Sequence, residues 1–364
     1  MNISVKTLIL TAVAVMTSMT VTAQTSQKLT ANKTNEYGLI YTLPKTTLTV
    51  ALSARKTVKT PGEFYLYAKK YLGTDPIVTP STTWELVGAQ IVPGAVADME
   101  RQYIAQFKSG SSPFMMLTAE DFPLALNDEG YEMPAMPSVT LKEEDAKPTI
   151  LEQPVARQAV TEEMLQSHSS AKRAELAAAK IYELRQQRND IIAGQAENMP
   201  SDGQAMQLAL DNLAAQEAAL TAMFLGTTST SIEVKTYDFT PEASSDAAKV
   251  VIARLSVVDG LVDASNLSGD PVYLNLTVTE RGKLPVNEKG VVKTFPKGGV
   301  AYCIPGAMNA VVTFGGKTIV KESIEVAQYG VVFGLEPSLF TNKKETSYLH
   351  YNPLTGAILE LGTK

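Results

Sequence analysis

The chain has 364 residues, 45% of them hydrophobic, and its 32 basic and 38 acidic residues leave a net charge of −6 at pH 7. Enough apolar side chains are present to build folded cores, which excludes a disordered chain. A mildly acidic protein without a basic run is a poor binder of nucleic acids and anionic lipid surfaces, so we expect neither partner.

The first 23 residues have the layout of a secretory signal peptide. Lys6 precedes an apolar stretch, and Val21-Thr22-Ala23 places small residues just before Gln24. The unbroken apolar core, residues 8–16, is too short to span a bilayer, and no later apolar run is long enough. No cysteine near the cleavage point could carry a lipid. We therefore expect an exported protein, periplasmic or associated with the outer membrane or cell surface, without N-terminal lipidation or membrane insertion after cleavage.

Residues 24–155 are predicted to form an N-terminal β-rich domain. Strand patterns occupy residues 37–44, 46–52 and 83–92. Residues 64–73 predict a short helix that ends at Gly73. Residues 112–154 are rich in Pro, Met and acidic side chains, which is typical of a long loop with short strands.

Residues 156–228 are predicted to be helical. Thr161 is a suitable N-cap for a helix that reaches Ile192. Ser201 and Gln204 form a capping box at the start of a second helix, which Gly226 ends. Because the connection between the two helices is short, they are expected to pack antiparallel as an αα-hairpin.

Residues 229–364 return to strand patterns, and the spacing of the strands predicts a sandwich. The expected strands are 231–239, 249–257, 272–279, 299–304, 308–314, 319–325 and 330–335. The predicted fold class is therefore α+β, with β-sandwich-like lobes flanking an antiparallel αα-hairpin.

Three segments share a sequence plan, namely residues 37–44, 298–305 and 329–337. Each has a glycine, two aliphatic or small residues, an aromatic residue, and then Leu or Ile shortly before a proline. Two interpretations stay open. The plan is either a recurring way of ending a strand or the trace of duplicated β-domains on either side of the helices.

The mature chain resembles an exported family of Bacteroides-like bacteria that is described as a domain of unknown function. The resemblance is carried by YGLIYTLP at 37–44, PGEFYLYAKKYLG at 61–73, AAKIYELRQQR at 178–188 and AQYGVV at 327–332. It implies an envelope protein of a Gram-negative anaerobe. It implies no activity, cofactor or catalytic residue.

Common catalytic and metal-binding arrangements are missing from the sequence. Only two histidines occur, His168 on an expected helix and His350 in an expected strand, and Cys303 is the single cysteine, within an apolar run. A histidine-based triad or a Cys/His metal site therefore has few residues to draw on, and we expect no cofactor and no metal. Adjacent acids such as Glu120-Asp121 and Glu143-Glu144 are read first as solvated loop residues.

We therefore expect a non-enzymatic envelope protein that binds or scaffolds other envelope or outer-membrane proteins. Arg185 and Arg188, on the first long helix, are the candidate partner-binding residues. The alternatives are a glycan-binding protein or, third, a hydrolase with a carboxylate pair. The candidate ligand-binding residues for the glycan alternative are aromatic: Trp84, Tyr65, Tyr67 and Tyr71.

Overall fold

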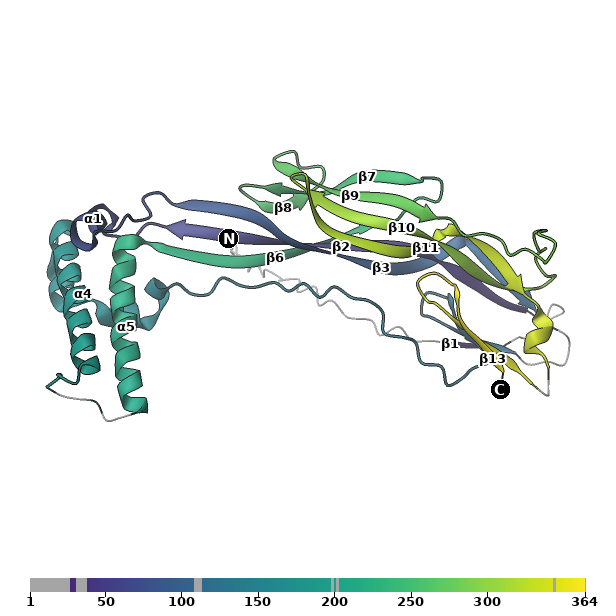
Figure 1. Ribbon diagram of the computed structural model, residues 1–364, viewed down its shortest axis with the longest axis horizontal. Helices are drawn as coiled ribbons and strands as arrows, with labels where there is room; N and C mark the ends of the chain where they lie inside the picture. Colours follow the sequence, from purple (N-terminus) through teal and green to yellow (C-terminus); the bar gives the residue numbers. More distant parts are fainter. Residues whose placement is uncertain are drawn as a thin grey trace, which may run out of the picture.

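The computed structural model of the protein describes residues 27–30, 38–107, 113–197, 200, 203–342 and 345–363. It is a mixed α+β structure with three antiparallel sheets and a group of helices, so the predicted fold class is confirmed at that level. Figure 1 shows an elongated molecule, with the helices at one end and the sheets along the rest of its length. Among the described residues, no helix has both the length and the apolar character needed to cross a membrane.

A long central sheet holds the molecule together. Its strand order is β3-β2-β6, with β2 (Gly38–Thr60) between β3 (Ser81–Gln106) and β6 (Thr227–Phe239). The 23 residues of β2 correspond to roughly 75 Å at about 3.3 Å per residue. The expected strands 37–44 and 46–52 are thus parts of one strand, which continues past Pro44 across a register shift in its pairing with β3.

A second sheet packs on one face of the central sheet. Its strand order is β11-β10-β9-β7-β8. The strands are β7 (Ala247–Ser256), β8 (Gly260–Asp263), β9 (Gly269–Glu280), β10 (Val300–Phe314) and β11 (Lys317–Leu335). The core between the two sheets joins Leu48, Val50 and Leu52 of β2 to side chains such as Leu274 and Val312. Alternation along β2 places these even-numbered residues on one face.

The four strands expected between residues 299 and 335 are two long strands, β10 and β11. A proline was expected to end the first of them, but Pro305 lies inside β10, at a register shift between Ile304 and Gly306. Proline has no backbone N–H to pair, and a bulge is the place in a strand where it is tolerated. Gly306 fits there because a Cβ atom would lie 2.6 Å from the Glu280 carbonyl oxygen.

The two long hairpins, β2–β3 and β10–β11, share the same irregularity. From Thr42 to Pro44 the chain advances two positions along β2, whereas its partners advance five positions along β3, from Gln102 to Ala97. From Ile304 to Gly306 it likewise advances two positions along β10, whereas its partners advance five positions along β11, from Val331 to Val326. The sequence plan shared by residues 37–44 and 298–305 therefore marks equivalent positions in two hairpins.

The two irregular regions touch each other through buried polar groups, which we call the junction. Gln328 is buried, and its amide exchanges two hydrogen bonds with the backbone of Thr46, 2.9 Å from Thr46 N–H and 2.7 Å to Thr46 C=O. The same amide nitrogen donates to Pro241 C=O at 3.3 Å, just after β6. The Thr46 hydroxyl accepts from Ala327 N–H at 3.0 Å. The junction thus ties β2, β11 and the end of β6 together.

A third sheet, with strand order β1-β4-β5-β12-β13, combines both ends of the chain. Its strands are β1 (Gln27–Thr30), β4 (Phe114–Leu117), β5 (Pro123–Leu126), β12 (Ser347–Tyr351) and β13 (Ile358–Thr363). Its core includes Tyr41 and Tyr351, whose hydroxyls both donate to Ala301 C=O, at 3.0 and 3.2 Å. The β-rich parts before and after the helices therefore share sheets.

The helices lie at the far end of the central sheet. They are α1 (Ala68–Leu72), α2 (Pro154–Ala159), α3 (Glu162–Gln166), α4 (Ser170–Ile192) and α5 (Gln204–Leu225). The single helix expected over 161–192 is broken between α3 and α4. The break arises because Thr161 caps α3 and Ser169 caps α4 with their side chains. Ser201, the expected cap of the second helix, lies outside the described residues.

The helices α4 and α5 lie side by side (Figure 1), and α5 leads directly into β6. Residues 128–149, which we call the strap, run in extended form from the third sheet to the helices (Figure 1). On the way the strap contacts β3, where Gln90 accepts from Thr140 N–H at 2.8 Å and donates to Ser138 C=O at 3.2 Å. It then meets the outer edge of β6.

The junction predicts a large stability cost for one substitution. Gln328→Met keeps the side-chain volume but leaves the buried N–H and C=O of Thr46 without their amide partner. Each such loss costs about 1–3 kcal/mol, so we expect the free energy of unfolding to fall by about 3 kcal/mol. Urea unfolding measures it. Gln216→Met, on α5, is the matched control and should change it by less than about 0.5 kcal/mol. Equal effects of the two variants would contradict the role given to the junction.

Candidate functional site

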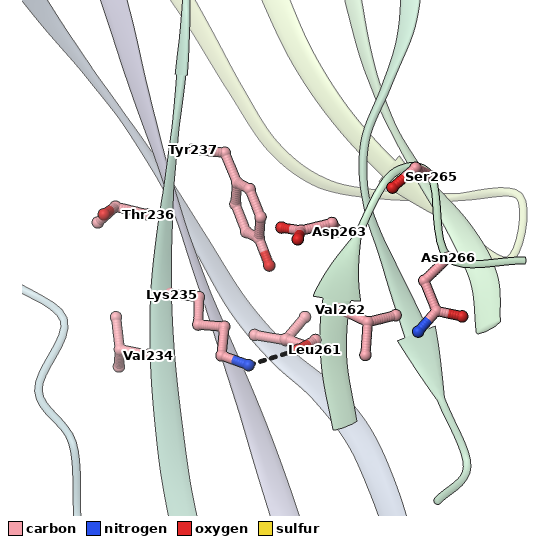
Figure 2. A pocket seen from close by; sticks show the side chains of 9 residues that line it. All are labelled: Val234, Lys235, Thr236, Tyr237, Leu261, Val262, Asp263, Ser265 and Asn266. Atoms are coloured by element: carbon pink, nitrogen blue, oxygen red, sulfur yellow. Dashed lines mark hydrogen bonds between the residues drawn. The ribbon is translucent and has the colours of Figure 1, made fainter. Parts of the chain in front are cut away.

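A cavity of about 630 Å³ opens between β6 and β8, and we call it the edge groove. The two strands are edge strands of the central and second sheets. Figure 2 shows the side chains that line it, from β6 on one side and from β8 and the following turn on the other. They are Val234, Lys235, Thr236, Tyr237, Leu261, Val262, Asp263, Ser265 and Asn266.

Strand alternation sets which β6 side chains enter the edge groove. Lys235 and Tyr237 point toward β8, whereas Val234 and Thr236 point away from it (Figure 2). The opposite wall is short because β8 has only four residues. It begins at Gly260, whose φ of 75° is readily adopted by glycine. No strand was expected over residues 260–263, so this wall was not predicted.

Tyr237 contributes a buried hydroxyl that has no hydrogen-bond partner among the described residues. Burial, with the nearby charges of Asp263 and Glu233, raises the pKa of Tyr237 to about 12, so the phenol stays protonated at neutral pH. The Tyr237 ring lies beside the Asp263 carboxylate (Figure 2). The hydroxyl is therefore a donor that lacks an acceptor, and leaving it so costs about 1–3 kcal/mol.

Lys235 links the two walls of the edge groove. Its ammonium donates to Leu261 C=O at 2.6 Å, the dashed line in Figure 2, and pairs with Glu233 at 2.8 Å. The carbonyl of Leu261 thus points away from β7, at the free edge of β8. A positive charge and a carboxylate, Asp263, consequently line the same small space.

The outer edge of β6 already pairs with an extended segment, the strap. Ile232 and Glu144 exchange two backbone hydrogen bonds, at 2.8 and 3.0 Å. The next outward-facing amide, of Val234, donates to the Glu143 carboxylate at 3.4 Å. The outward N–H and C=O of Thr236 come next on this edge, and within the described part of the chain no hydrogen bond to them is formed. The edge is therefore open beside the edge groove.

Trp84 lies apart from the candidate tyrosines, of which Tyr67 and Tyr71 come together with ring centroids 6.5 Å apart. Trp84 packs against the core between the central and second sheets, whereas Tyr67 and Tyr71 pack against the helical core. Tyr65 lies in the turn of 3₁₀ helix that precedes α1. The indole N–H of Trp84 donates to Val258 C=O at 3.3 Å, and Lys56 lies 5.5 Å from the ring centroid. Trp84 also lines a separate cavity of about 400 Å³.

The two candidate arginines converge on one residue. Arg185 Nε lies 2.6 Å from one carboxylate oxygen of Glu217 on α5, and Arg188 lies 2.7 Å from the other. The acids Glu143 and Glu144 bind the strap to β6, as described above.

The histidines and the cysteine occupy structural positions. His350 is buried in β12, with its ring nitrogens 2.8 Å from Asp128 and 3.2 Å from Glu360, and it stacks on Tyr131. His168 is exposed in the break between α3 and α4 rather than on a helix. Burial raises the pKa of the Cys303 thiol to about 11. In the described residues no group of three or more His, Cys, Asp or Glu could hold a metal ion.

The comparison with protein families shows which family the chain belongs to. A family model described as Domain of unknown function (DUF4831) matches residues 37–359, and the chain belongs to this family. The match covers the two long hairpins, the strap, the helices and the edge groove. No curated protein and no solved structure showed significant similarity to the chain.

The unpaired hydroxyl leads to an unusual stability prediction. Tyr237→Phe removes a buried donor that has no acceptor, so it should raise the free energy of unfolding of the free protein by about 1 kcal/mol. The matched control is Tyr41→Phe, which removes a hydroxyl bonded to Ala301 C=O and should lower that free energy by about 1 kcal/mol. Thermal and urea unfolding measure both variants. A destabilising Tyr237→Phe would mean that the hydroxyl is already bonded.

Proposed function

We propose that this protein is an exported, non-enzymatic envelope protein that binds an extended segment of another protein along the outer edge of β6. The observation that carries the proposal is the pairing of Ile232 with Glu144 of the strap, on an edge that then stays open at Thr236. An edge strand offers unpaired N–H and C=O groups to an added strand, and this is a recurrent mode of peptide recognition.

The strap supports strand addition because it is an example within the same chain. It approaches β6 antiparallel and pairs through backbone groups at one position only. The strap comes from β3, where Gln90 binds it, and it reaches the edge of β6 at Ile232. It therefore does not cover the stretch of β6 around Thr236. Exposed edges are usually blunted by charges, prolines or covering segments, and the strap covers only the part of this edge near Ile232.

The edge groove supports specificity beyond backbone pairing. A peptide on the β6 edge would place alternate side chains next to the wall formed by β8. The Tyr237 hydroxyl could then donate to a carbonyl or side-chain oxygen of the peptide, which would give this buried hydroxyl the partner that it lacks among the described residues. Asp263 and Asn266 offer an acceptor and an amide at the rim.

The glycan alternative stays a prediction. Trp84 is half-buried, and its ring is in close contact with Gly260, where a Cβ atom would lie 2.8 Å from the ring. Contacts within the protein thus use part of the surface that a sugar would stack on, and no observation favours this function over peptide binding.

Export is the second part of the proposal and rests on the leader-like residues 1–23. Expression of the full chain with its leader in a Gram-negative host should yield a mature protein that begins at Gln24 in the envelope fraction. Intact-mass and N-terminal peptide mass spectrometry measure this. A chain that keeps residues 1–23 and stays in the cytoplasm would contradict export. It would not bear on peptide binding at the β6 edge, which has its own test.

Strand addition is tested by proline substitution on the outer edge of β6. Thr236→Pro removes an outward N–H without breaking the pairing with β2, so it should abolish binding of the partner while leaving the unfolding midpoint nearly unchanged. Thr230→Pro changes another outward-facing threonine of β6, on the far side of Ile232 from the edge groove, and is the matched control. A photo-crosslinking amino acid at Asn266 reports on occupancy in native envelopes.

The expected result is one cross-linked peptide whose yield is lost in Thr236→Pro and kept in Thr230→Pro. An adduct that survives Thr236→Pro would contradict strand addition. The absence of any adduct at Asn266 in native envelopes would contradict binding at the edge groove.

A further inference from the structure

The helical end of the molecule carries an arginine cluster that is separate from the edge groove. Arg185 and Arg188 are three residues apart on α4, so they lie on the same face of the helix. Both guanidinium groups bind Glu217 of α5, each to a different carboxylate oxygen, at 2.6 and 2.7 Å. Two positive charges therefore share one negative charge.

The surplus charge remains accessible. The side chains of Arg185 and Arg188 are 39% and 34% exposed, whereas that of Glu217 is only 13% exposed. A guanidinium has five N–H donors, and in the described part of the chain Glu217 is the only acceptor that either arginine has. The cluster thus keeps one net positive charge, and most of its N–H donors form no hydrogen bond within the described residues.

A cavity of about 430 Å³ lies against this cluster. Most of the side chains that line it on α5 are small, among them Ala214, Ala218 and Thr221. Small residues leave the guanidinium groups reachable from solvent, and the Thr221 hydroxyl is a further possible donor. No acidic residue other than Glu217 lines the cavity.

We propose that this cavity binds the carboxylate side chain of an acidic segment of a partner protein. Arginine forks match carboxylates through paired hydrogen bonds, and one surplus positive charge matches a group with one negative charge. A dianionic phosphate would bring more negative charge next to Glu217, which repels it. Glu217 is a positioning residue: it orients both guanidinium groups and weakens the field that the ligand meets.

The test measures binding of a fluorescent hexaglutamate peptide to the full mature chain by anisotropy at low ionic strength. In Arg185→Gln/Arg188→Gln the affinity should fall at least about tenfold, because both charged donors are lost. In Glu217→Gln the affinity should rise about threefold or more, because the competing carboxylate is neutralised while the amide oxygen still holds one arginine. Melting curves show whether each variant is folded.

The matched control is Lys172→Gln/Lys180→Gln, which removes two positive charges from the same helix and should leave the affinity within about twofold. A loss in this control as large as in the arginine variant would show non-specific attraction and overturn the proposal. So would weaker binding in Glu217→Gln, no binding to the wild-type chain, or displacement of the peptide by inorganic phosphate at lower concentration than by glutamate. If the arginine variant fails to fold, the peptide affinities of Arg188→Lys and Glu217→Gln are compared with that of the wild-type chain and decide between the outcomes.

Discussion

The paired hydrogen bonds between the Gln328 amide and the Thr46 backbone fix the relation between the sheets. They form where the irregular regions of two long hairpins meet. Each of those regions contains a proline, Pro44 in β2 or Pro305 in β10. Because the amide also holds Pro241 C=O, the end of β6 is tied to β11. Buried polar groups that are fully paired specify one arrangement, since any other leaves them without partners.

This constraint explains why β6 and β8 face each other. The strand β2 is paired on both sides, so the free edges of the central sheet belong to β3 and β6. The second sheet packs on β2 through an apolar core, and its last strand, β8, ends beside β6. The edge groove is thus the space that remains where two stacked sheets stop. Its lining combines charged and polar side chains with Val234, Leu261 and Val262, and among the described residues the Tyr237 hydroxyl has no acceptor there.

The sequence predicted local elements well and their combination poorly. Alternation identified most strands, and the caps at Thr161 and Gly73 act as expected. The prolines at 44 and 305 were read as strand ends, because local patterns do not show that a partner strand supplies the extra residues of a bulge. The candidate site was missed for a related reason. Lys235 and Tyr237 lie on one face of a predicted strand, but no strand was expected over 260–263, and nothing local shows that two sheet edges meet.

Recognition is proposed at one strand edge, the outer edge of β6, and amide hydrogen exchange at single-residue resolution tests that proposal most directly. In the free protein the outward amide of Thr236 should exchange quickly, whereas Ile232, paired with the strap, and Lys235, paired with β2, should be protected. When the partner segment identified by cross-linking is added, the amide exchange of Thr236 should slow, whereas that of Ile232 and Lys235 should not change. A Thr236 amide that is already protected in the free protein, or that still exchanges quickly when the partner is bound, would contradict the account.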